Sequence, residues 1–206
     1  MNIRDILTRE EAIRRLKLII GKDLRIFAKK FGINIFANGH LNKGWAGDTL
    51  ERYLGLEKNN NQAPNGRYFE LKQISLKKLK NGEIVPKETM QITMINPNER
   101  LKSGFLESHA YKKLKSLLLC AILYSSPGGE TKLCRVDTLD VDKHEVFDQL
   151  KKDYELIAKS LNNKGFKSLK SEMGYYIQPR TKGPGHGSVS RAFYARTRLL
   201  KKILSL

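Results

Sequence analysis

The sequence predicts an α/β fold with a mixed central sheet flanked by helices, and three observations support this fold class. Residues 115–124 form a near-continuous apolar run, which is typical of a central strand buried on both faces. Residues 67–74 alternate polar and apolar side chains, and Asn81-Gly82 is a strong hairpin-turn signal before a further strand at 88–95. Apolar residues at helical spacing surround these strands, so helices are expected on the faces of the sheet.

The helices are predicted from apolar periodicity and from capping residues. Thr8 followed by Glu11 is typical of a capping box that opens a long helix over 9–30, and Gly32 suits the end of that helix. A basic terminal helix is expected to begin at Ser188. The remaining predicted elements are helices at 45–55, 107–114 and 143–161 and strands at 131–136 and 174–178.

The charge of the chain points to a polyanionic partner. The 206 residues include 39 Lys and Arg against 21 Asp and Glu, which gives a formal net charge of +18 and a pI near 9.9. Nucleic acid and an anionic membrane surface are the two candidates. Between Lys167 and Leu206, nine basic residues stand against one acid, Glu172. Because such segregation predicts a face that meets phosphate, we favour nucleic acid over a membrane.

The sequence also predicts the compartment. No run of about 18 apolar residues occurs, so no segment is expected to span a bilayer. Residues 1–11 mix charges and lack the apolar core of a signal peptide. Cys120 and Cys134 lie in apolar segments without a Cys-x-x-Cys spacing, which is typical of reduced, buried thiols. We therefore expect a cytoplasmic protein without a membrane partner.

The strand motif Glu70-Leu71-Lys72 carries the candidate chemistry. Alternate residues of a strand project from the same face, so Glu70 and Lys72 can point into one cleft. Carboxylate and carbonyl oxygens ligate Mg²⁺, and a nearby lysine can orient or deprotonate an attacking water. A Glu-x-Lys pair on an exposed edge strand is common, however, so the motif gains weight only from its context.

Several further motifs occur in order around this strand. They are Asn42–Glu51, the Pro64-Asn65 turn, Glu88-Thr89-Met90, Arg180–Gly183 and Ser190–Arg196. Together with Glu70-Leu71-Lys72 they resemble the MutH/Sau3AI-like PD-(D/E)XK nucleases, and they are most similar to the MvaI/BcnI-type restriction endonucleases. The resemblance covers residues 38–95 and 174–204 and is weaker between them.

The resemblance implies a restriction endonuclease-like fold with a DNA-binding cleft, and it assigns roles to single residues. Glu51, Asn65, Glu70 and Lys72 would be catalytic. The metal ligands would be Glu70, the carbonyl of Leu71, Asn65 and Glu51, and the cofactor would be Mg²⁺, for which Mn²⁺ can substitute. Lys43 would contact DNA from the Lys-Gly-Trp segment before the helix at 45–55.

Asn65 is the main departure from the family's pattern, which has a metal-binding aspartate at this position. An amide offers one neutral oxygen and no charge, so the affinity for the metal should fall. Three interpretations stay open: an inactivating substitution, a natural variant that relies on Glu51, and a degenerate DNA-binding protein.

The C-terminal segment, about 165–206, is predicted to read DNA. Glycine lets the backbone approach phosphate closely, and a helix that begins at Ser188 would direct its positive dipole towards the DNA. Residues 1–206 are expected to form a single nuclease domain, either undivided or with a catalytic lobe at about 1–135. The side chains expected to contact DNA in this segment are Arg180, Lys182, His186, Ser188, Arg191, Tyr194 and Arg196.

The leading functional hypothesis is a type II site-specific deoxyribonuclease that cleaves double-stranded DNA. The resemblance to MvaI and BcnI implies a monomer, and a cognate DNA methyltransferase would be its natural partner. Two alternatives remain: a MutH-like endonuclease that nicks one strand in mismatch repair, and a DNA-binding module whose nuclease centre has decayed at Asn65.

Overall fold

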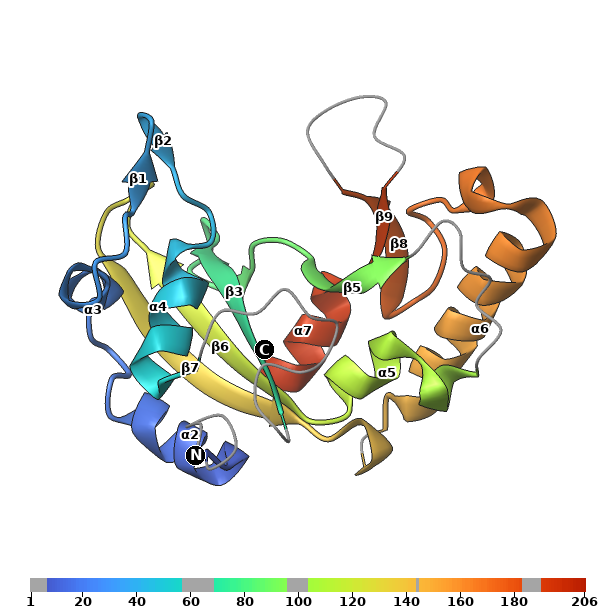
Figure 1. Cartoon of the computed structure of the whole chain (residues 1–206), viewed down its shortest axis with the longest axis horizontal. Coiled ribbons are helices and arrows are strands. Elements are labelled where there is room, and N and C mark those ends of the chain that lie inside the picture. The colour runs from blue at the N-terminus through green and yellow to red at the C-terminus, as the bar shows by residue number, and fades with distance from the viewer. Residues whose placement is uncertain (1–6, 57–68, 96–103, 144, 183–189) are drawn as a thin grey trace.

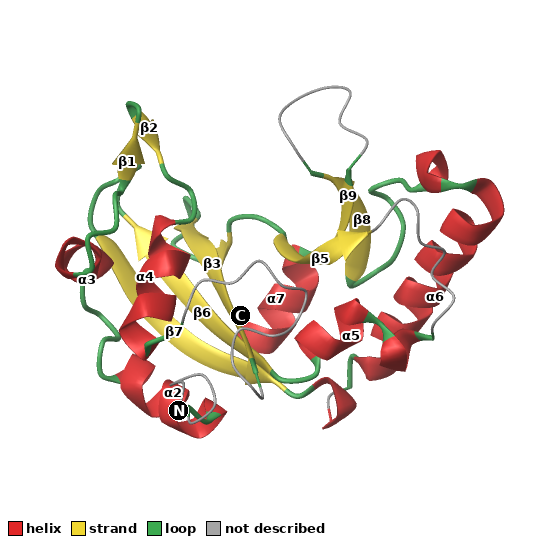
Figure 2. Ribbon diagram, viewed as in Figure 1, coloured by secondary structure: helices red, strands yellow, loops and turns green. Residues whose placement is uncertain are grey.

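The computed structural model describes residues 7–56, 69–95, 104–143, 145–182 and 190–206. In these ranges a four-stranded sheet, a three-stranded sheet, a two-stranded hairpin and the surrounding helices form an α/β structure (Figures 1 and 2). No helix in these ranges is both long enough and apolar enough to cross a membrane. The expected division into two lobes stays a prediction.

The larger sheet has the predicted mixed topology. Its strands are β3 (Glu70–Lys78), β4 (Ile84–Pro86), β6 (Leu117–Tyr124) and β7 (Thr131–Leu139), in the order β4-β3-β6-β7. β3 runs parallel to β6, while the β3–β4 and β6–β7 pairs are antiparallel. The first six residues of β6 are buried, which confirms the central strand expected at 115–124. The Asn81-Gly82 turn is also confirmed, because Gly82 has a φ of 88° between β3 and β4.

The smaller sheet was not predicted as a unit. Its strands are β5 (Met90–Ile95), β8 (Ile177–Thr181) and β9 (Arg191–Ala195), with β9 in the centre. The expectation of a helix that begins at Ser188 is wrong, because residues 191–195 pair on both sides with β5 and β8. The terminal helix α7 begins only at Thr197 and ends at Leu204. Two strand partners outweigh the weak local helical preference of this segment.

The helix expected over 9–30 is also wrong, because the chain forms two helices there. These are α2 (Arg9–Lys17) and α3 (Leu24–Lys30). Gly21 interrupts them with a φ of 80°, a left-handed conformation that favours glycine, and its amide donates to the carbonyl of Leu133 in β7 at 2.8 Å. Asp23 then caps α3 by accepting from the amide of Arg25.

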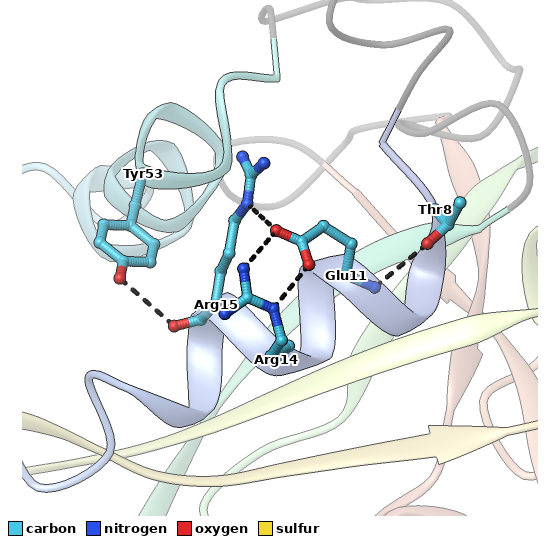
Figure 3. Close-up of polar contacts among 5 residues, drawn as sticks. All are labelled: Thr8, Glu11, Arg14, Arg15 and Tyr53. Carbon is cyan, nitrogen blue, oxygen red and sulfur yellow. Dashed lines mark hydrogen bonds and ion pairs between the residues drawn. The ribbon is translucent and has the colours of Figure 1, made fainter.

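The start of α2 has the predicted cap in part (Figure 3). The Thr8 hydroxyl accepts from the amide of Glu11 at 3.1 Å, but the Glu11 carboxylate turns to Arg14 and Arg15, each at 2.7 Å. These two guanidinium groups lower the pKa of Glu11 to about 2. The Tyr53 hydroxyl donates to the carbonyl of Arg15 and so fastens α4 (Trp45–Leu54) to α2.

The remaining helices agree with the prediction to within a few residues. They are α5 (His109–Leu114) and α6 (Phe147–Lys164), with 3-10 turns at Phe105–Glu107, Val141–Lys143 and Phe166–Ser168. A short hairpin of β1 (Phe36–Ala37) and β2 (His40–Leu41) precedes α4. In Figure 1, α7 lies between the larger and the smaller sheet.

The core consists of two apolar clusters on opposite faces of the larger sheet. Leu118, Cys120 and Ile122 of β6 join residues of α2, α3 and α4 in one cluster. Leu117, Leu119 and Ala121 join residues of α5, α6, α7 and the smaller sheet in the other. Strand alternation places these two sets on opposite faces, so β6 is the wall between the clusters.

A buried carboxylate connects α6 to the smaller sheet. Asp153 is 2% exposed and accepts from the amides of Tyr175, Tyr176 and Ile177 at 2.5–2.9 Å. Gly174, with a φ of 75°, allows this close approach, because a Cβ atom there would lie 1.9 Å from the Ile177 carbonyl oxygen. Asp153 therefore fixes the point at which β8 begins.

We predict that Asp153→Ala lowers the free energy of unfolding by about 3 kcal/mol, because buried amides lose a charged acceptor. Urea denaturation followed by circular dichroism measures this loss. The matched control is Glu155→Ala at an exposed position of the same helix, which should change the stability by less than about 0.5 kcal/mol. Equal effects of the two substitutions would contradict the anchoring role.

Candidate active site

Glu70 is the centre of the candidate active site. It is the first residue of β3, and its side chain is 1% exposed. The carboxylate oxygen Oε1 lies 2.9 Å from Nζ of Lys72 and 2.8 Å from Nζ of Lys113. Glu70 and Lys72 thus meet as the strand motif predicts, and Lys113 is a third member that was not predicted.

Strand register explains why Lys113 reaches Glu70. The Glu70 amide donates to the carbonyl of Ser116 at 2.9 Å, and Glu70 is the register partner of Leu117 in β6. Because α5 ends at Leu114, just before β6, its last turn must lie beside the first residue of β3. One local feature could have indicated the burial of Lys113. Its neighbours on the helix, Ala110 and Leu114, are apolar and buried.

The charges of this cluster favour an anionic ligand. A buried carboxylate is costly unless it is paired and hydrogen-bonded, and here two ammonium groups pair with it. Among the described side chains of this cluster, two are cations and one is an anion. Lys113 has an exposed side-chain fraction of 11%, whereas that of Lys72 is 27%. Lys72 is therefore the ammonium with more access to a phosphate or a water molecule.

Of the other predicted site residues, the structure describes Glu51 and Lys43 but not Asn65. Glu51 lies in the last turn of α4 and is partly buried, and Lys43 is exposed just before that helix. Leu50 and Leu54 of α4 pack in the same cluster as Leu71 of β3, which holds the helix against the strand. Asn65 lies outside the described residues.

The donors of the described chain fit a Mg²⁺ site only in part. Glu70 offers a carboxylate, but two lysines already neutralise it. Leu71 points its side chain into the apolar cluster, which leaves only its carbonyl oxygen as a donor. Within the ranges described above, no group of three or more His, Cys, Asp or Glu side chains is arranged to hold a metal ion.

Arg180 and Tyr194 form the best-defined part of the predicted DNA-reading surface. Arg180 of β8 is exposed, and its Nη1 donates to Oγ1 of Thr89 at 2.6 Å. The guanidinium carbon lies 5.5 Å from the ring centroid of Tyr194 in β9. Burial raises the pKa of Tyr194, while the charge of Arg180 opposes that rise. The side chain of Arg180 is therefore held in place before any ligand binds.

The other predicted DNA-contacting residues in the described ranges have contacts of their own. Arg191 lies over the ring of Phe166, at 5.6 Å from its centroid, and the amide of exposed Lys182 donates to the carbonyl of Ser190. Arg196 instead donates to the carbonyls of Ser171 and Met173, and burial lowers its pKa. A DNA contact of Arg196 stays a prediction. His186 and Ser188 lie outside the described residues.

We predict that Lys113→Met lowers the free energy of unfolding by about 3 kcal/mol, because the buried Glu70 carboxylate then loses the ammonium group that lies 2.8 Å from it. Combining it with Glu70→Gln should cost less than the sum of the two single losses, as a double-mutant cycle in urea would measure. Lys112→Met, at the exposed neighbouring position, is the control and should have little effect. Additive losses would argue against a direct pair.

Comparison with known proteins relates this site to characterised nucleases. The sequence profile of the family described as DNA mismatch repair enzyme MutH matches residues 54–153, which include Glu70, Lys72 and Lys113. The type II restriction enzyme Sau3AI of Staphylococcus aureus is 24% identical over 205 residues, which are 97% of this chain and 41% of that enzyme. The chain thus spans about two fifths of the length of this curated relative.

Among solved structures, a complex of restriction endonuclease MvaI with its cognate DNA substrate is similar at 14% sequence identity. The match covers 95% of this chain and 97% of that one, with a TM-score of 0.40. The resemblance stated from the motifs is confirmed by the sequence matches. The chain thus has a mixed sheet with flanking helices, and its sequence is similar to the MutH family over residues 54–153 and to Sau3AI.

Proposed function

We propose that this chain is a sequence-specific endonuclease that hydrolyses phosphodiester bonds in double-stranded DNA, in the manner of a type II restriction enzyme. The observation that carries the proposal is the buried Glu70 carboxylate held between Lys72 and Lys113 at the start of β3. The net charge of +18 and the similarity to Sau3AI support a polyanionic substrate of this kind.

The two lysines have different tasks in this proposal. Lys113 is nearly buried, so it fixes the orientation of the Glu70 carboxylate. Lys72 has the more accessible ammonium, so it orients the attacking water and stabilises the charge that develops on the phosphate. The water oxygen forms a bond to phosphorus as the bond to the 3′ oxygen breaks. Hydrolysis of one phosphodiester bond leaves a 5′-phosphate and a 3′-hydroxyl on the strand that is cut.

Magnesium dependence, with Mn²⁺ as a substitute, belongs to the same proposal. A bound Mg²⁺ would lower the pKa of a water molecule and neutralise phosphate charge. Glu70, the Leu71 carbonyl and Glu51 would be its donors from the described chain, with Asn65 as the further donor that the resemblance implies. A monomeric enzyme with a cognate DNA methyltransferase is proposed on the resemblance alone.

We expect the chain to convert supercoiled plasmid to linear DNA in the presence of Mg²⁺ or Mn²⁺, and chelation of the metal by EDTA should stop the reaction. Lys72→Ala should lower the cleavage rate by about 100-fold or more while DNA binding in a gel-shift assay is retained. Lys159→Ala, at an exposed position of α6, is the control and should cleave normally. A Lys72→Ala variant that cleaves at the normal rate would exclude the role assigned to Lys72.

Open circles as the sole product of the wild type would instead identify a strand-nicking enzyme like MutH.

A second candidate is a DNA-binding module without nuclease activity. Asn65 favours it, because an amide replaces the aspartate that the family's pattern leads us to expect.

Asn65→Asp distinguishes the two candidates. If the centre is intact apart from this residue, the substitution should increase Mg²⁺-dependent plasmid cleavage, because a carboxylate binds Mg²⁺ more strongly than an amide does. Asn61→Asp, in the same polar segment, controls for the added charge. Sequence-specific DNA binding without cleavage by the wild type and by Asn65→Asp would establish the binding module.

A further inference from the structure

A basic groove lies at the far end of β3 from Glu70. It has a volume of about 560 Å³ and is lined by the ends of β3 and β6 and the start of β7, together with Lys87 after β4. Its charged residues are Lys77, Lys78, Lys87 and Lys132 against a single acid, Glu130. We call this pocket, with its four lysines, the lysine groove. The β6–β7 turn beside it approaches Phe36 of the β1–β2 hairpin (Figure 1).

The lysine groove is separate from the candidate active site. Leu76, which lines the groove, lies six positions after Glu70 on the same strand. A strand rises about 3.3 Å per residue, so roughly 20 Å separate the two positions. Both nevertheless belong to β3, and a rigid strand holds them at this distance.

The positive charge of the groove is only partly neutralised from within the protein. Lys132 pairs with Glu130 at 3.2 Å, and both side chains are about half exposed. Lys77 and Lys78 are exposed, and no ion pair joins either of them to a carboxylate in the part of the chain that the structure describes. Cations that gather with few acids create a positive potential that attracts anions, so the groove is suited to bind one.

One lysine of the groove is already ordered. Nζ of Lys87 donates to the Tyr124 hydroxyl and lies 4.8 Å from the centroid of the Tyr124 ring. The hydrogen bond raises the pKa of Lys87, which keeps the ammonium charged. An ordered cation loses less conformational freedom on binding than a mobile one does.

We propose that the lysine groove binds a phosphate of the DNA backbone beside the segment that the enzyme cleaves. This inference rests on the proposed function and adds a contact that positions the duplex without reading its sequence. Lysine ammonium groups contact phosphate oxygens as point charges, and such contacts fix the register of a protein on the duplex. At about 3.4 Å per base pair, a separation of roughly 20 Å corresponds to up to about six base pairs from the cut.

The test compares two double substitutions that remove the same charge. K77Q/K78Q alters the groove, and K151Q/K152Q alters two exposed lysines of α6. The affinity for a fluorescein-labelled DNA duplex is measured by fluorescence anisotropy in EDTA over a series of NaCl concentrations. If the groove binds one phosphate, K77Q/K78Q should reduce the slope of log affinity against log salt by about 0.9. The K151Q/K152Q slope should equal that of the wild type. An unchanged slope for K77Q/K78Q, or equal reductions in both variants, overturns the proposal.

A second arm distinguishes the DNA backbone from a free phosphate compound. Titration calorimetry with inorganic phosphate and with a nucleoside monophosphate should give no saturable binding to the wild type. Saturable binding that K77Q/K78Q abolishes, with an unchanged DNA salt slope, would overturn the proposal in favour of a small-molecule site. Thermal unfolding by circular dichroism checks that both variants fold.

Failure of this inference is distinguishable from failure of the proposed function. A reduced salt slope with no plasmid cleavage by the wild type would support the phosphate contact and refute the nuclease activity. Cleavage by the wild type with no change of slope in K77Q/K78Q would support the nuclease activity and refute the phosphate contact.

Discussion

The parallel pairing of β3 with β6 is the constraint on which the candidate active site depends. Parallel neighbours cannot be joined by a tight turn, so the chain must return from the end of β3 to the level at which β3 begins. On this return it forms β4, β5 and α5. Since α5 ends just before β6, the pairing of Glu70 with Leu117 carries Lys113 to the Glu70 carboxylate. The topology of the sheet thus assembles a cluster from residues 43 positions apart.

In our proposals, charged residues at one end of β3 take part in cleavage, and charged residues at its other end bind the DNA backbone. At its first residue the strand holds a carboxylate that pairs with the ammonium groups of Lys72 and Lys113. At its last residues it presents Lys77 and Lys78 to a groove with one acid. A single strand is stiff, so a duplex that contacts both ends would be positioned by a fixed distance. Because β3 pairs on both sides, with β4 and β6, this distance does not depend on a loop.

The smaller sheet is held by different interactions. Asp153 of α6 fastens the start of β8 by three main-chain hydrogen bonds, and β9 fills the centre between β5 and β8. Arg180 of this sheet is kept in place by a hydrogen bond to the Thr89 hydroxyl and by a cation–π contact with the ring of Tyr194. Preorganisation of this kind lowers the entropic cost of binding, which is why we regard Arg180 as the strongest DNA-contact candidate on this sheet.

The local sequence by itself determined the apolar central strand β6, the Asn81-Gly82 turn and the pairing of Glu70 with Lys72. Each depends on short-range periodicity or turn chemistry, which neighbouring residues specify. The tertiary structure decided the break at Gly21, the strand at 191–195 and the approach of Lys113 to Glu70. These features depend on partners distant in sequence: the carbonyl of Leu133, the flanking strands β5 and β8, and the register of β3 with β6. Local propensities are worth at most about 1 kcal/mol per residue, so contacts between distant segments override them where the two conflict.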